Sequence, residues 1–144
     1  MVPPPRPPYE IARLDDIRNT ESDDRYGFSL VGQWKQIRHH FHIQEFAANA
    51  FISTEAGQEI VHEHIEGPND DSSDVGDEEL YVIFRGSATF KANGNSYQVA
   101  EGTLIFIGDP SVTRSVTANE PETVVLTFGT NPGVRFAVSA ATRC

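Results

Sequence analysis

The chain is poor in cysteine and in positive charge. Its 144 residues include a single cysteine, Cys144, so no disulfide can form within the chain, and a catalytic thiol is not expected at a terminus. Eleven Lys and Arg residues against 21 Asp and Glu residues give a formal net charge of −10. Nucleic acid and anionic membrane surfaces are bound by an excess of cationic side chains, so we expect neither as a partner.

Long apolar runs and several common catalytic motifs are also missing. No apolar stretch approaches the roughly 18 residues of a membrane-spanning helix, and the N-terminus lacks the basic-then-apolar pattern of a secretory signal. We therefore expect a soluble, cytoplasmic protein. The sequence contains no Gly-x-Ser-x-Gly elbow, no Gly-x-x-x-x-Gly-Lys phosphate loop and no dinucleotide fingerprint before a helix.

What the chain has in abundance is short runs of β-branched and aromatic residues separated by turn residues. About ten such runs recur with turn signals between them, which predicts an all-β sandwich or barrel. The expected strands span residues 34–46, 47–52, 60–64, 79–85, 88–91, 97–100, 103–107, 112–118, 123–128 and 134–138.

The N-terminal region reads differently from the rest. Residues 1–8, MVPPPRPP, are expected to form an extended arm because proline lacks a backbone donor. Residues 9–19 fit a short amphipathic helix, or a strand followed by a turn. We therefore predict two regions, a proline-rich arm with its connecting segment at 1–25 and a β-barrel domain at 26–144.

Two strands carry the side chains that indicate a site. His62 and His64 are two residues apart, so on an extended strand both imidazoles would leave from the same face. Glu79 and Tyr81 likewise share one face of a mainly apolar strand, where a carboxylate needs a partner. Two imidazoles and one carboxylate can hold a divalent metal with open positions. The alternative is that the histidines only hydrogen-bond each other and the carboxylate.

These residues resemble the first conserved motif of the cupin superfamily. Gly57, His62, His64, Glu79 and Gly86 follow the motif in order, although fourteen acidic and turn-forming residues separate His64 from Glu79 where the family has a short gap. We interpret this insertion as a solvated loop, since lengthening a loop costs little entropy.

The second motif of that family is only partly present. Its register begins at Gly102, and Thr113 stands where the family has a fourth metal-binding histidine. His40 and His42 also alternate on an expected strand, but no glutamate follows them at the cupin spacing, so we do not expect them to be ligands.

The resemblance implies a double-stranded β-helix, the jelly-roll barrel of the cupins, with a short N-terminal helix or arm. It also implies a homodimer and a small-molecule substrate bound in the barrel. Iron is the metal favoured for His62, His64 and Glu79, with Zn, Mn or Ni also acceptable to these ligands.

The surrounding side chains have expected supporting roles. Glu79 and Tyr81 are the candidate catalytic residues, with Tyr81 donating to Glu79 or acting as a general acid or base. Thr113 could hold a metal-bound water, and Asn49 could project into the pocket. Glu66 has the parity of the two histidines and is a reserve carboxylate. By strand alternation, Arg114 is expected to point away from the face of Thr113 and to pair with an acidic surface residue.

The leading functional hypothesis is a metal-dependent cupin enzyme that acts on a small organic molecule. Oxygenase chemistry and Lewis-acid cyclase, isomerase or lyase chemistry are both compatible with the residues. The alternative is a cupin that binds a small ligand without metal or turnover, because Thr113 replaces the histidine of the second motif. A self-associating structural protein is the third hypothesis.

Overall fold

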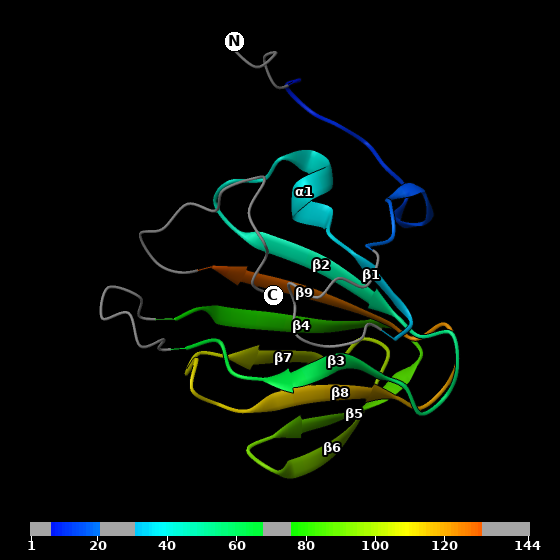
Figure 1. Ribbon diagram of the computed structural model, residues 1–144, viewed down its shortest axis with the longest axis vertical. Helices are drawn as coiled ribbons and strands as arrows, with labels where there is room; N and C mark the ends of the chain where they lie inside the picture. The colour runs from blue at the N-terminus through cyan, green and yellow to red at the C-terminus, as the bar shows by residue number, and fades with distance from the viewer. Residues whose placement is uncertain (1–6, 21–30, 68–75, 131–144) are drawn as a thin grey trace.

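The computed structural model describes residues 7–20, 31–67 and 76–130. These residues form two antiparallel sheets that face each other, with few helical residues (Figure 1). One sheet has the strand order β1-β2-β9-β4-β7 and the other has the order β3-β8-β5-β6. The strands are β1 (Gln33–Lys35), β2 (Ala47–Ile52), β3 (Glu59–His64), β4 (Glu78–Arg85), β5 (Ser87–Ala92), β6 (Asn95–Ala100), β7 (Leu104–Ile107), β8 (Arg114–Ala118) and β9 (Val124–Thr130).

The core lies between the two sheets and follows from the alternation of the strands. On β4, Glu79, Tyr81 and Ile83 are buried, while the residues between them are more exposed. An apolar cluster fills the same interior, and its large members include Phe90 of β5 and Trp34 of β1. The all-β sandwich predicted from the sequence is confirmed, and Glu79 and Tyr81 do share its inner face.

The N-terminal part of the described chain is less regular than predicted. Residues 9–19 contain only one turn of 3-10 helix, Leu14–Asp16, and Asn19 forms an isolated antiparallel bridge with Lys35. The expected strand at 34–46 is also shorter, because β1 ends at Lys35 and the α-helix α1 (Ile37–Phe41) follows it.

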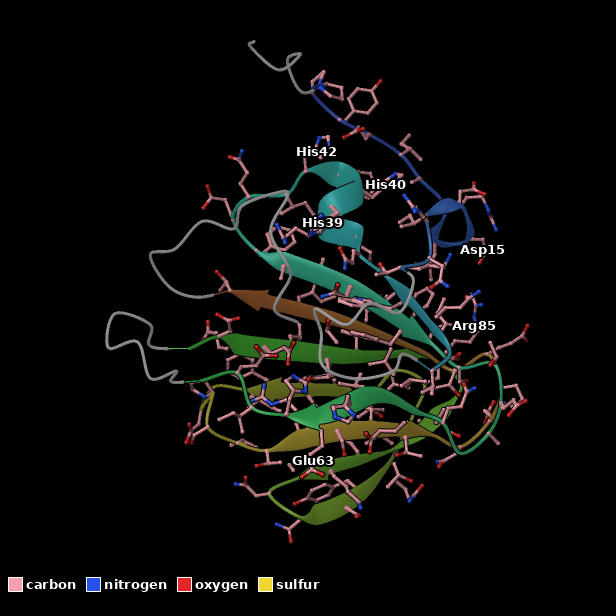
Figure 2. All side chains as sticks on the ribbon, viewed as in Figure 1. Asp15, His39, His40, His42, Glu63 and Arg85 are labelled. Carbon is pink, nitrogen blue, oxygen red and sulfur yellow. The ribbon has the colours of Figure 1, made fainter. Side chains whose placement is uncertain are left out.

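Helix α1 packs on β2, on the side away from the second sheet (Figure 1). The small residues Ala48 and Ala50 face that side and are buried, which lets the helix approach the strand closely. His42 ends the helix in the left-handed conformation, with φ of 57°. His40 and His42 therefore do not alternate on a strand, and Figure 2 shows them around α1, outside the sandwich.

Several sequence predictions concern residues outside the described ranges. These are the first part of the proline-rich arm, the boundary at residue 25, the centre of the acidic insertion and the expected strand at 134–138. Within the described ranges, no helix is long and apolar enough to cross a membrane.

Gly86 and Gly94 share a strained backbone conformation but differ in their surroundings, so alanine substitutions at the two positions separate backbone strain from steric contact. Gly86 and Gly94 both have positive φ, +78° and +81°, so alanine at either position is strained by about 1 kcal/mol. A Cβ on Gly86 would also lie 2.6 Å from Thr123 Oγ1 and 2.9 Å from Thr123 Cα, whereas a Cβ on Gly94 meets nothing within 4 Å. Gly86→Ala should therefore cost at least about 1 kcal/mol more unfolding free energy than Gly94→Ala in urea titration. Equal losses would show that the contact with Thr123 is relieved at no cost.

Candidate metal centre

Three side chains at one end of the sandwich bring their donor atoms together. His64 is the last residue of β3, Glu66 follows two residues later, and Glu79 begins the buried face of β4. One donor atom from each of the three lies within 4.8 Å of the others. Glu66 and Glu79 are 6% and 1% exposed, so two carboxylates are withdrawn from water at one point. Such a cluster needs compensating positive charge.

The imidazole of His64 is held at both nitrogens. Its Nδ1 lies 2.6 Å from the carbonyl oxygen of His62, and its Nε2 lies 2.7 Å from Glu66 Oε1. Burial lowers the pKa of His64, but the hydrogen bond and negative charge of Glu66, the His62 carbonyl and the charge of Glu79 outweigh it, so the pKa is raised overall. A histidine that donates Nδ1–H to a backbone carbonyl keeps Nε2 directed at one point, which suits a metal ligand.

Glu79 is fully enclosed and bonded to residues of both sheets. Its Oε1 accepts a hydrogen bond of 3.1 Å from Arg114 of β8, and both side chains are 0% exposed. Burial and the neighbouring charge of Glu66 raise the pKa of Glu79 to about 7, against the opposing effects of a hydrogen bond from Tyr81 and the positive charges of His64 and Arg114. The carboxyl group is therefore close to its protonation midpoint at neutral pH.

The buried charges near this cluster do not balance. Glu66 and Glu79 are both carboxylates at most 6% exposed. Arg114 supplies one fixed buried positive charge beside them. Protons on His64 and Glu79, or a divalent cation bound between them, can supply the rest.

In the structure, the side chain of His62 lies away from His64 and Glu79, with which the sequence analysis grouped it. The pairing of β3 with β8 shifts register between Val61 and His64, so the strict alternation assumed for the strand fails there. The side chain of His62 is 53% exposed, and its Nδ1 lies 3.1 Å from Glu59 Oε1. The two imidazoles do not leave from the same face as expected, and Glu66 is the third residue of the group whose donor atoms converge.

Arg114 also differs from its expected position. It pairs with a carboxylate as expected, but with the buried Glu79 and not with a surface residue. Its guanidinium donates in addition to the carbonyl oxygens of Val112 and Pro110. Opposite His64 in the β3–β8 register, Arg114 places its charge beside the candidate ligands.

The remaining candidates lie around this cluster rather than in it. Tyr81 shares the inner face of β4 with Glu79 and packs edge-on against Phe90 at 5.3 Å. Thr113 lines a surface cleft of about 100 Å³ together with Glu63 and Lys91. Asn49 is fully buried on β2 and accepts a hydrogen bond of 2.8 Å from the Trp34 indole.

One sequence signal did point to the observed group. Glu66 has the same odd–even parity as His62 and His64, and its place at the start of the acidic insertion favoured a solvated position. In the structure, Glu66 is held against the sandwich instead, because its N–H donates to the carbonyl of Pro110 at 2.9 Å. That contact joins residues 44 positions apart, so it cannot be read from local spacing.

Comparison of the sequence with protein families and with curated proteins finds no relatives. No protein-family model matches the chain, and no curated protein is similar to it. Solved structures, in contrast, resemble it closely enough to define its fold.

Three structures illustrate the likeness. A cupin protein from Bacteroides fragilis has a TM-score of 0.61 and 12% identity, over 96% of this chain and 99% of its own. A sugar phosphate isomerase of the cupin superfamily from Silicibacter pomeroyi has a TM-score of 0.63 and 11% identity, over 88% of this chain and 78% of its own. A protein from Acidithiobacillus ferrooxidans, whose proposed activity is sugar phosphate isomerisation, has a TM-score of 0.56 and 17% identity. That match covers 69% of this chain, which spans 58% of the longer protein.

These matches and the two facing antiparallel sheets confirm the cupin fold that the first motif indicated. At identities of 11–17%, the likeness concerns the fold, and the chemistry has to be argued from the residues of this chain.

The buried ion pair between Arg114 and Glu79 makes a prediction about stability. Arg114→Met should lower the unfolding free energy by about 3–5 kcal/mol at pH 8, because it leaves a carboxylate buried without its partner. Arg85→Met is the matched control, since Arg85 is exposed and should lose less than about 1 kcal/mol. Adding Glu79→Gln to Arg114→Met should recover part of the loss. Urea titrations of the wild type and the three variants measure these values, and equal losses for Arg85→Met and Arg114→Met would contradict the argument.

Proposed function

We propose that the protein is a metal-dependent enzyme that acts on a small organic molecule in the cupin sandwich. The observation that carries the proposal is the convergence of His64 with two buried carboxylates, Glu66 and Glu79, within 4.8 Å. The excess of buried negative charge at this point favours a divalent cation over an empty site.

The donor set supports a choice among metals. One imidazole nitrogen and two carboxylate oxygens are harder ligands than the two imidazoles and one carboxylate anticipated from the sequence. Mn, Fe and Zn all accept such ligands, and the oxygen-rich set favours Mn or Fe(II) over softer ions. When bound, the metal would supply Lewis-acid polarisation of a substrate oxygen.

Other residues of the chain would orient the ligands and carry a proton. His64 donates Nδ1–H to the His62 carbonyl, which fixes Nε2 for the metal. Arg114 holds one oxygen of Glu79 and leaves the other for the metal. Tyr81, which shares the inner face of β4 with Glu79, is placed to hold or deliver a proton at its hydroxyl.

Among the reactions compatible with this site, proton transfer assisted by a Lewis acid is favoured, as in isomerases and lyases. The hydroxyl of Tyr81 beside the candidate ligands supports it, because oxygenase chemistry does not require a proton donor there. The sugar phosphate isomerase from Silicibacter pomeroyi shares the fold and supports an aldose or ketose as the substrate class.

A metal-free binding protein is the second candidate. Its support is that the cluster already satisfies many of its hydrogen bonds: His64 with Glu66, and Glu79 with Arg114. In that case, protons on His64 and Glu79 would compensate the buried charge.

The homodimer, the cytoplasmic location and the exclusion of nucleic acid and membrane as partners stay predictions from the sequence.

Metal content separates the two candidates. Wild-type protein dialysed against Mn(II) or Fe(II) under nitrogen should retain close to one equivalent by elemental analysis. His64→Ala and Glu66→Gln should lose it, because each removes one of three ligands. His62→Ala is the control and should retain the metal, since His62 is exposed and bonded to Glu59. Loss in His62→Ala with retention in Glu66→Gln would restore the ligand set expected from the sequence and refute the one proposed.

The affinity for metal should rise with pH. Both His64 and Glu79 have raised pKa values, so protons compete with the metal at and below neutral pH, and the affinity is reduced there. Between pH 6 and pH 8 the dissociation constant for Mn(II) should fall by about tenfold or more, as one or two protons are released. Calorimetry in buffers of different ionisation enthalpy measures both the constant and the number of protons. A pH-independent constant with no proton release would contradict this assignment.

A further inference from the structure

A row of buried polar side chains crosses the inner face of the five-stranded sheet next to Glu79. Asn49 of β2 is paired in register with Thr127 of β9, and Thr127 is paired with Tyr81 of β4. Asn49, Thr127 and Tyr81 are each 0% exposed. Tyr81 is two residues from Glu79, so the row lies one pleat from the candidate metal ligands.

Two atoms in this row lack hydrogen-bond partners among the described residues. They are Nδ2 of Asn49, whose Oδ1 is bonded to the Trp34 indole, and Oγ1 of Thr127. Each such buried group costs about 1–3 kcal/mol when it is left unsatisfied. The two residues lie directly opposite each other, yet neither uses the other as a partner. An unsatisfied pair of this kind calls for a ligand or a water.

Small residues occupy the neighbouring pleat of the same sheet. In the same sheet, Glu79 is paired with Gly129, and Gly129 is paired with Ala47. Neither residue projects more than a methyl group from the inner face. The strands therefore carry little side-chain volume between Glu79 and the unsatisfied atoms of Asn49 and Thr127.

We infer that Asn49 and Thr127 bind the uncharged end of the substrate while its other end lies at the metal ligands. The inference rests on the proposed function and deepens it by defining the substrate class. Nδ2 of Asn49 donates to an oxygen, and Oγ1 of Thr127 donates to or accepts from one. The group bound there is therefore a hydroxyl or a carbonyl.

The positions of the buried Lys and Arg side chains are consistent with an uncharged ligand group beside Asn49 and Thr127. Arg114 is bonded to Glu79, and Lys35 donates to the carbonyl oxygen of Ile17 at 2.7 Å. Arg38 is on α1, which packs on the other side of β2. Among the described residues, no buried Lys or Arg is placed to neutralise a phosphate or carboxylate at Asn49 and Thr127.

The spacing limits the length of the substrate. Thr127 lies one strand and one pleat from Glu79, a diagonal of about 8 Å between Cα atoms, so roughly five or six chain atoms would reach from the metal ligands to Thr127. The substrate class is thus a short polyhydroxylated carbonyl compound, with an oxygen at each end and any charged group outside the row. A ketose or aldose of about five carbons has this form.

The test compares Thr127→Val with Thr127→Ser. Valine removes the hydroxyl and keeps the shape, whereas serine keeps the hydroxyl. Calorimetry with D-ribulose, ribitol and D-ribulose 5-phosphate is carried out on Mn(II)-loaded and chelator-treated wild type and on both variants. At least one probe should bind the loaded wild type. Its affinity should fall tenfold or more in Thr127→Val and stay within about threefold in Thr127→Ser, because a site built to bond a hydroxyl is impaired when that bond is lost.

Metal content and thermal stability serve as independent readouts. Both variants should retain the metal, and Thr127→Val without ligand should melt no lower than the wild type, because it removes an unsatisfied buried group. Failure of every probe to bind the wild type would overturn the inference, as would equal affinity of the two variants. A lower melting temperature of Thr127→Val together with unchanged affinity would show that the hydroxyl holds a buried water only.

The same data separate this inference from the proposed function. If binding of a probe depends on Thr127 but the protein takes up no metal, the binding role of Asn49 and Thr127 is supported and the proposed metal-dependent activity is refuted. If the metal binds at His64, Glu66 and Glu79 but Thr127→Val changes the affinity for no probe, the binding role of Asn49 and Thr127 is refuted and the proposed metal site stands.

Discussion

The buried ion pair between Glu79 and Arg114 is the constraint on which this site depends. It connects β4 of the five-stranded sheet to β8 of the four-stranded sheet across the interior, with both side chains at 0% exposure. Two charges removed from water in this way must hold each other closely, because the loss of either leaves the other uncompensated. The pair therefore fixes the distance between the sheets at the end where the candidate ligands converge.

The pair does not neutralise its surroundings, and this imbalance gives the site its chemical character. Glu66 adds a second buried carboxylate beside Glu79, which raises the pKa of Glu79 to about 7 together with burial. Glu66 also raises the pKa of His64. A site arranged in this way binds protons readily at neutral pH, and it can exchange them for a divalent cation.

Much of the fold could be predicted from the sequence, because its signals are local. Alternation on β4 placed Glu79 and Tyr81 on the inner face, and Asn93-Gly94 marked the β5–β6 hairpin, where both residues have positive φ. The site could be predicted only in part. His64 and Glu79 were found, whereas the register shift in β3 turned His62 outward and the hydrogen bond of Glu66 to Pro110 placed Glu66 beside them. Neither event leaves a signal in residue spacing, since both depend on pairing with distant segments.

The position of β9 between β2 and β4 has a consequence for biosynthesis. Residues 47–52 and 78–85 are made early, but they cannot join into one sheet until residues 124–130 are available to lie between them. Pairings between residues so far apart in the chain form slowly. During translation, β4 can pair with β7, but its edge that faces β9 stays open until β9 arrives, and the interior around Glu79 closes late. A chaperone that shields the exposed edges of β2 and β4 would act in this interval.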